Sequence, residues 1–191
     1  MRQAFHFLSQ AAVNWRQTGA IAPSSRRLAR TMADAVGEAP SGSVIIELGP
    51  GSGCVTEALH NRFPHCRVIA IENNASFAER LAARMPSVPI IYGCASALSA
   101  HLDHTGLTSK EVVAVVSGLP LLSLDPVLVN SILSSVRQVL QPGGRFIQFT
   151  YSERAFSNRL TPTGFRLGSR RRIWLNVPPA VVLSFIRNPG T

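Results

Sequence analysis

The chain has 191 residues, which is enough for one compact domain with a sizeable core and too few for two domains of ordinary size. Hydrophobic residues make up 46% of it, and Gly and Pro are scattered rather than clustered, so the composition excludes a disordered or low-complexity chain. The formal net charge is +9, from 18 Arg and one Lys against 10 acidic residues.

Positive charge gathers at the two ends of the chain. Residues 1–33 carry five Arg and no acid, and residues 151–191 carry seven Arg and one Glu, whereas the middle is nearly neutral. This asymmetry predicts a polyanionic partner, either a nucleic-acid backbone or an anionic membrane surface. The longest apolar run, around 112–124, is interrupted by Gly118 and Pro120 and is shorter than the roughly 20 residues that span a bilayer.

The sequence predicts a cytoplasmic protein. Its three cysteines have neither metal-ligand nor disulfide-framework spacing, so we expect reduced thiols and no metal. The N-terminus lacks a long apolar run followed by a small-residue cleavage site, and we therefore expect no secretory signal. The oligomeric state is left open.

Residues 1–40 are expected to form a helical lid or membrane segment that precedes the cofactor-binding core of the same single domain. Apolar side chains recur at steps of three and four between positions 2 and 17, with Phe5 and Trp15 on one face, which predicts an amphipathic helix. The stretch "APSS" then provides a cap for a second helix over 26–36.

Residues 41–191 show the alternation of strand and helix patterns that is typical of an α/β core. We expect strands at 43–49, 67–72, 88–93, 112–118 and 143–151, with helices at 56–63, 77–85 and 126–140. These strands are apolar on both faces, which indicates a parallel sheet with right-handed crossovers. After Tyr151 the alternation stops, and we expect two closing strands, 165–177 and 180–187, with no helix before them.

A glycine-rich turn, "ELGPGSG" from Glu47 to Gly53, stands at the carboxyl end of the first strand, where open α/β sheets bind ligands. Its glycines follow the series G-x-G-x-G, because the Gly that a dinucleotide fingerprint needs at position 54 is a Cys. Glu72 ends the second strand, where a carboxylate can accept hydrogen bonds from both hydroxyls of a ribose.

The E-x-G-x-G-x-G turn, the acid after strand two and "LQPGG" before strand five together resemble class I methyltransferases that use S-adenosylmethionine. The resemblance implies a Rossmann-like sheet, mostly parallel with an antiparallel closing strand. It also implies that the cofactor is held by Glu47, Gly49, Gly51, Ser52, Gly53, Glu72, Asn73, Cys94 and Ala95. One position departs from the pattern, because Cys94 stands where the family usually has an Asp that contacts adenine, and Cys is a poor acceptor.

A narrower resemblance covers nearly the whole chain: the bacterial phospholipid N-methyltransferases of the soluble, membrane-associated type. It rests on "TGAIAPSSRRLARTMA", "ELGPGSG", "VVSGLPLLSL", "PGGRFIQFTY" and "WLNVPPAVV", which occur in the family's order. It implies stepwise methylation of the phosphatidylethanolamine headgroup toward phosphatidylcholine by a peripheral membrane enzyme.

The acceptor site is then expected at the turn after strand four, Ser117, Gly118, Leu119 and Pro120, together with Tyr151. A primary amine has a pKa of about 10, so holding it neutral at pH 7 costs about 4 kcal/mol, which desolvation and orientation can supply without a strong base. The carbonyls of the turn can accept hydrogen bonds from the amine, and Tyr151 can contact the amine or the growing cation. His6, His101 and His104 stay open as proton acceptors.

Membrane or substrate contacts are predicted for Phe5, Trp15, Arg16, Arg26, Arg27, Arg170, Arg171 and Arg172. Aromatic and Arg side chains suit a headgroup layer, and the guanidinium group matches a phosphate. The same residues can instead form a packed helix and ordinary solvated faces, and Trp174 is expected in the core.

Two other functions stay open. A nucleic-acid adenine methyltransferase would use the basic ends, but it commonly carries an aromatic residue after the strand-four Pro, which this chain lacks. A membrane-binding module without catalysis would explain Cys94.

Overall fold

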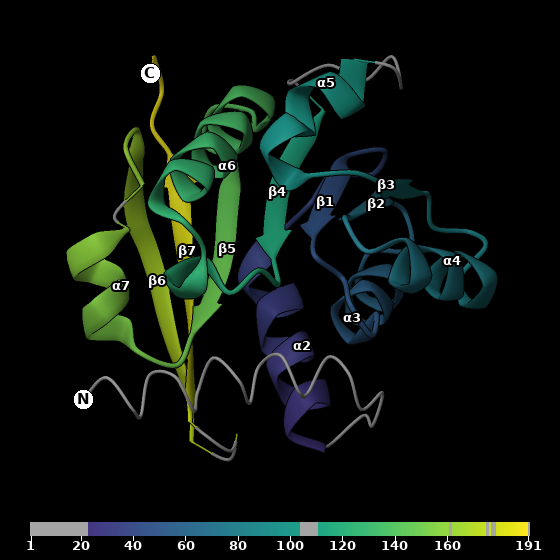
Figure 1. Cartoon of the computed structure of the whole chain (residues 1–191), viewed down its shortest axis with the longest axis horizontal. Helices are drawn as coiled ribbons and strands as arrows, with labels where there is room; N and C mark the ends of the chain where they lie inside the picture. Colours follow the sequence, from purple (N-terminus) through teal and green to yellow (C-terminus); the bar gives the residue numbers. More distant parts are fainter. Residues whose placement is uncertain (1–22, 104–110, 161, 175, 177–178, 191) are drawn as a thin grey trace.

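The structure is a computed structural model, which describes residues 23–103, 111–160, 162–174, 176 and 179–190. A seven-stranded sheet in the order β3-β2-β1-β4-β5-β7-β6 forms the middle layer, with helices on both faces (Figure 1). Its strands are β1 Val44–Leu48, β2 Arg67–Glu72, β3 Ile90–Tyr92, β4 Val112–Ser117, β5 Arg145–Thr150, β6 Phe165–Ile173 and β7 Ala180–Arg187. The helices are α2 Pro23–Val36, α3 Cys54–Arg62, α4 Ala75–Arg84, α5 Leu98–Asp103, α6 Pro126–Val139 and α7 Glu153–Arg159.

The order of the strands places a ligand crevice at β1 and β4. β1 pairs in parallel with β2 on one side and with β4 on the other, and β4 pairs in parallel with β5. The chain therefore adds β2 and β3 on one side of β1, and then returns to add β4 and β5 on the other side. The carboxyl ends of β1 and β4 diverge at this switch point, where open α/β sheets bind their ligands.

One strand runs against the others. β7 is antiparallel to both β5 and β6, so β6 again runs in the direction of β5. The predicted fold class, a mostly parallel Rossmann-like sheet with an antiparallel closing strand, is confirmed.

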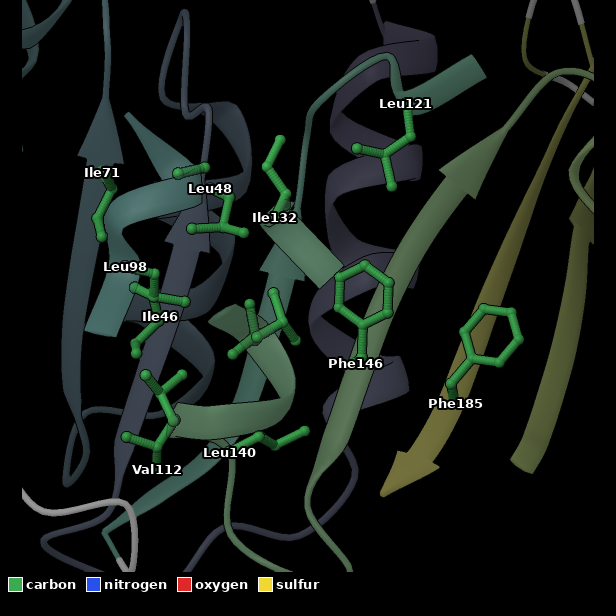
Figure 2. Packing of buried hydrophobic residues seen from close by; sticks show 14 of the residues in the cluster. Ile46, Leu48, Ile71, Leu98, Val112, Leu121, Ile132, Leu140, Phe146 and Phe185 are labelled. Atoms are coloured by element: carbon green, nitrogen blue, oxygen red, sulfur yellow. The ribbon is translucent and has the colours of Figure 1, made fainter. Parts of the chain in front are cut away.

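Two hydrophobic cores cover the two faces of the sheet, because strand side chains point alternately to either side. The core toward α5 and α6 contains Ile46, Leu48, Leu98, Ile132 and Phe146, which converge between sheet and helices in Figure 2. The core on the opposite face is closed by α2 and α3.

Helix α2 is amphipathic and belongs to the body of the domain. Its side chains Leu28, Met32 and Val36 are buried against the sheet, while Arg26 and Arg27 face solvent. The predicted helix over 2–17, with Phe5, Trp15 and Arg16, lies outside the described residues, and the separate role of residues 1–40 stays a prediction. Within the described ranges no helix is long and apolar enough to cross a bilayer.

Two expectations for the C-terminal region are wrong. A helix, α7, does precede the closing strands; it has seven residues, and Phe156 is the one buried side chain among those whose burial the structure describes, which is too few for a periodic pattern. Trp174, expected in the core, is 69% exposed. It follows the last residue of β6, beyond the strand that the apolar core covers.

Phe146 tests the core on the α6 face. It is fully buried, and its ring centroid lies 6.1 Å from that of Phe165 and 6.2 Å from that of Phe185. We expect Phe146→Ala to lower the free energy of unfolding by about 3–5 kcal/mol, because it removes an aromatic side chain and leaves a cavity. Urea unfolding measures the loss. Val127→Ala, at an exposed position of α6, is the control and should change stability by less than about 0.5 kcal/mol; equal effects of the two variants would contradict this packing.

Candidate active site

The glycine-rich loop after β1 has the backbone shape that its sequence predicts. Gly49, Gly51 and Gly53 have φ values of +68°, +52° and +78°, in the left-handed region that favours glycine. A Cβ at Gly53 would collide with the side chains of Leu81 and Arg84. Arg84 also donates a hydrogen bond to the Ser52 carbonyl at 2.5 Å, so α4 supports the loop from outside.

The loops after β1 and β4 contact each other where Gly118 meets Gly49. The Gly118 amide donates to the Leu48 carbonyl at 2.8 Å, which continues the pairing of the two strands into their loops. A Cβ at Gly118 would lie 2.7 Å from the Gly49 carbonyl oxygen. Because that neighbour is backbone and cannot rotate away, only glycine fits at position 118 without a shift of the loop.

Glu72 ties the loop after β2 into the same assembly. It is 4% exposed, and its two carboxylate oxygens accept hydrogen bonds from the amides of Gly51, at 3.1 Å, and Asn74, at 3.0 Å. A carboxylate has about four acceptor positions, so both oxygens can still accept from hydroxyls of a ligand. Glu72 thus holds the glycine-rich loop and keeps acceptor capacity.

Glu47 is the second buried carboxyl group, and it has no such support. It is 1% exposed, and neither of its carboxylate oxygens has a hydrogen-bond partner among the described residues. Burial raises the pKa of Glu47 to about 8; the hydroxyl and amide of Thr56, which lie close but outside hydrogen-bond geometry, oppose the rise, and the nearby Glu72 carboxylate adds to it. A buried acid without a partner is costly unless a ligand cation completes it.

A recess of about 480 Å³, including the solvent at its mouth, opens beside Glu47. It is lined by Leu28, Met32, Glu47, Gly49, Pro50, Gly51, Ser52, Cys54, Val55, Gly118 and Phe149. It brings together the predicted cofactor residues of the first loop and Gly118 of the predicted acceptor turn. Sequence reasoning missed its apolar walls. The signal lay in the alternation of Phe149 with Tyr151 at the end of β5 and in the amphipathic pattern of the 26–36 helix.

The predicted adenine side lies at the ends of β2 and β3. Asn73 and Cys94 are exposed, and Ala95 is buried. The Cys94 thiol lies 3.1 Å from the Ser96 hydroxyl, and its carbonyl oxygen lies 3.2 Å from His101 Nε2. His101 therefore holds the backbone after β3, and Ser96 contacts the Cys94 thiol, at the position where the family usually has an Asp.

The predicted acceptor turn is braced from behind by a residue that the sequence reasoning missed. Gln148 is 1% exposed, and its side-chain amide donates to the carbonyls of Leu119, at 3.0 Å, and Phe149, at 2.8 Å. The buried Ser117 hydroxyl accepts from the Leu119 amide at 3.3 Å. The Leu119 carbonyl thus accepts one hydrogen bond from Gln148, and the carbonyls of Ser117 and Gly118 stay the predicted acceptors for the amine. Pro120 begins the short helical turn Leu121–Ser123.

Tyr151 stands next to the recess but does not line it. Its ring packs edge-on against Phe149, with centroids 5.5 Å apart. Burial raises the pKa of the Tyr151 hydroxyl, and a hydrogen bond with the Asn176 side chain opposes the rise, so the hydroxyl stays protonated at neutral pH.

The predicted basic residues are not part of the recess. Arg26 and Arg27 lie on the exposed face of α2, Arg171 is exposed on β6, and Arg170 and Arg172 pair with Glu153. Among the described residues, no three His, Cys, Asp or Glu side chains gather as metal ligands.

The family model of the methyltransferase domain matches residues 45–144, from β1 to the start of β5, and therefore includes the glycine-rich loop, Glu72 and the acceptor turn. The chain belongs to the class I methyltransferases. The predicted S-adenosylmethionine-dependent methyltransferase is thereby confirmed. This methyltransferase is 33% identical over 156 residues to the ornithine lipid N-methyltransferase of Singulisphaera acidiphila, covering 78% of this chain and 79% of that protein.

Solved structures share the fold of this methyltransferase. TrmN from Thermus thermophilus superposes with a TM-score of 0.69 at 19% identity, over 85% of this chain and 48% of that one. Geranyl diphosphate C-methyltransferase from Streptomyces coelicolor, in complex with Mg²⁺, geranyl-S-thiolodiphosphate and S-adenosyl-L-homocysteine, has a TM-score of 0.65 at 14% identity, over 84% and 75%.

The residues present fit S-adenosylmethionine, the cofactor of this family. The partnerless Glu47 carboxyl would meet its ammonium group in the glycine-lined recess, and the free acceptor positions of Glu72 would meet the ribose hydroxyls. The backbone at Cys94 and Ala95 would border the adenine. When bound, the cofactor supplies an electrophilic methyl group.

Glu47→Gln tests whether the buried carboxyl group destabilises the folded protein when no cofactor is bound. Between pH 4.5 and about 8 this carboxyl is protonated in the folded chain and ionised in the unfolded one. The wild type therefore loses up to about 1.4 kcal/mol of stability per pH unit across this window from Glu47 alone, and the variant does not. We expect the melting temperature of Glu47→Gln to gain on that of the wild type as the pH rises from 5 to 8, in calorimetry without cofactor. Glu57→Gln, on the exposed face of α3, should follow the wild type; a constant difference for Glu47→Gln would contradict the raised pKa.

Glu72→Ala tests the joint between the loops. The variant loses both amide hydrogen bonds and the ribose acceptor, so we expect cofactor affinity to fall at least about a hundredfold, from roughly 1.5–3 kcal/mol for each hydrogen bond to a charged group. Titration calorimetry with S-adenosylhomocysteine measures it, with Glu79→Ala on the exposed face of α4 as the matched control. An unchanged dissociation constant for Glu72→Ala would show that the ribose binds elsewhere.

Proposed function

We propose that this methyltransferase transfers methyl groups to the primary amine of a membrane-lipid headgroup, and to that of phosphatidylethanolamine in particular. The observation that carries the proposal is the composition of the recess. It contains one carboxyl group, Glu47, and one thiol, Cys54, and none of its lining residues is a His, Lys or Tyr. With Glu47 assigned to the cofactor, no general base of ordinary strength lines the recess.

An amine is the acceptor that such a recess can serve. An alkylammonium group has a pKa of about 10, and losing its proton at pH 7 costs about 4 kcal/mol. The apolar walls formed by Leu28, Met32 and Phe149 exclude water, which lowers the pKa of an ammonium group placed between them. A hydroxyl acceptor is a far weaker acid and would need a base.

The turn after β4 supplies orientation. The carbonyls of Ser117 and Gly118 are the predicted acceptors for the amine, and Gln148 fixes the peptide that follows them. Holding two reactants in line can lower the activation free energy by roughly 7–11 kcal/mol, which exceeds the cost of removing a proton from the ammonium group. Tyr151 packs on Phe149, whose ring lines the recess, and stays the predicted contact of a growing methylammonium cation.

A lipid is the favoured carrier of the amine. The relative from Singulisphaera acidiphila is named for N-methylation of ornithine lipid, and the alignment with it spans 78% of this chain. The concentration of Arg at the ends of the chain suits an anionic leaflet, and we propose a cytoplasmic protein that binds the membrane peripherally. Phosphatidylethanolamine is the specific acceptor that the sequence resemblance implies.

The nucleobase alternative lacks a stacking group. At the end of β4 the residue after Pro120 is Leu121, which is 2% exposed in the core between sheet and α6. An enzyme that holds a flipped base commonly stacks it on an aromatic ring at this place. Leu121 can provide neither the ring nor an exposed surface.

Methyl transfer into vesicles tests the proposal. The protein is incubated with methyl-labelled cofactor and with vesicles that contain phosphatidylethanolamine, vesicles that contain ornithine lipid, or single-stranded RNA, and the lipids are separated afterwards. We expect label in the methylated phosphatidylethanolamines. Label in ornithine lipid alone would keep lipid N-methylation and reject the phosphatidylethanolamine assignment, and label in RNA alone would reject both.

A further inference from the structure

An exposed aromatic side chain stands at the edge of the sheet where the recess opens. β7 pairs Thr150 of β5 with Val181 and Ile173 of β6 with Ala180, so the carboxyl ends of β5 and β6 lie at the same edge. Trp174 follows directly after β6 and is 69% exposed. A single exposed apolar side chain is common on protein surfaces, so the neighbours of Trp174 decide whether it has a role.

Trp174 is held by a chain of charged contacts. The guanidinium group of Arg172 lies 5.0 Å from the Trp174 ring centroid, in cation–π contact. The carboxylate of Glu153 pairs with Arg172 at 3.3 Å and with Arg170 at 2.6 Å. Hydrogen bonding to Arg170 lowers the pKa of Glu153, so this clamp is ionised at neutral pH. The three consecutive arginines exceed the single acid, and the corner is cationic.

The same corner is attached to the predicted acceptor site. Glu153 follows Tyr151 by two residues, and Asn176 follows Trp174 by two. The Tyr151 hydroxyl is hydrogen-bonded with Asn176, and Tyr151 packs on Phe149, which lines the recess. The segments 151–153 and 170–176 are therefore joined at two places. Trp174 lies in the sequence between these two links.

We propose that Trp174 with Arg170, Arg171 and Arg172, clamped by Glu153, forms a docking corner that seats in the headgroup layer of an anionic bilayer and turns the recess toward the lipid. This inference rests on the proposed lipid substrate. Arg neutralises lipid phosphates, and Trp is the side chain enriched at the level of the headgroups. A single-stranded nucleic acid would be favoured by a series of stacking aromatic residues, whereas Trp174 is the only exposed Trp, Phe or Tyr of β6 and its flanking described residues.

Fluorescence of Trp174 in the full-length chain tests the docking corner. The sequence has two tryptophans, so Trp15→Phe leaves Trp174 as the single reporter. On addition of phosphatidylcholine–phosphatidylglycerol vesicles we expect a blue shift and quenching by brominated acyl chains, with a much smaller change for pure phosphatidylcholine vesicles. The inference would be overturned if the fluorescence spectrum stayed unchanged in protein that sediments with the vesicles. It would also be overturned if single-stranded RNA shifted the spectrum and vesicles did not.

Vesicle sedimentation of variants gives an independent measurement. We expect Arg172→Gln to weaken binding to anionic vesicles about fivefold, which corresponds to about 1 kcal/mol for an Arg at the surface, and Trp174→Ala to weaken it about tenfold or more through lost interfacial area. Arg67→Gln is the matched control, because Arg67 is exposed at the amino end of β2, on the opposite edge of the sheet. Equal losses for Arg67→Gln and Arg172→Gln would show a diffuse charge effect and reject the corner.

The two proposals fail in different ways. Vesicle binding is measured without cofactor, and methyl transfer is measured with phosphatidylethanolamine in detergent micelles, where docking on a bilayer is not needed. Wild-type activity on micelles with vesicle binding unaffected by Trp174→Ala would reject the corner and keep the function. Vesicle binding that depends on Trp174, with no methyl transfer to any lipid, would reject the function and leave the corner as a membrane contact.

Discussion

The close approach of the β1 and β4 loops is the constraint on which the site depends. The Gly118 amide bonds to the Leu48 carbonyl, and a Cβ at position 118 would lie only 2.7 Å from the Gly49 carbonyl oxygen, so two backbones meet where other folds would place a side chain. Glu72 extends the contact to the β2 loop through the amides of Gly51 and Asn74. The three loops thus form one rigid rim before any ligand binds, which reduces the ordering cost of binding.

The buried Glu47 carboxyl group beside this rim lowers the stability of the fold, and ligand binding offers a reason for its presence. Glu72 is buried with two amide donors, whereas Glu47, one strand away, is buried with none among the described residues. Burial and the neighbouring carboxylate then raise the pKa of Glu47 to about 8. A protein selected for stability alone would replace such an acid with an apolar residue. Its presence beside a glycine-lined recess is the pattern expected when a ligand cation, absent from the free protein, completes the charge pair.

The sequence allowed the prediction of those parts of the site that depend on local chain chemistry. Strong strand patterns located β2 and β7 at their observed limits, and the glycine series together with Glu47 and Glu72 located the loops that meet at the switch point. Features that depend on packing between distant segments were missed. Gln148 looks like any other strand residue in the sequence, because its contact with the Leu119 carbonyl depends on the fold. Leu28 and Met32 line the recess only because α2 packs on the face of the sheet beside it. The exposure of Trp174 follows from its position after the last covered residue of β6, which no local pattern reveals.

The predicted acceptor turn has no side chain that would recognise one particular amine, so substrate specificity has to come from how the amine reaches the recess. A recess with apolar walls beside the predicted acceptor turn offers few polar groups that would distinguish one amine from another, because selection against a competitor needs unpaired or clashing groups in the site. Small free amines would then be accepted if they arrived at sufficient concentration. A docking corner fixed to Tyr151 through Asn176 would solve this problem by another route, since it raises the local concentration of headgroup amines and sets the edge of the sheet from which they enter. On this view the arginines and Trp174 contribute to substrate choice without touching the reacting nitrogen.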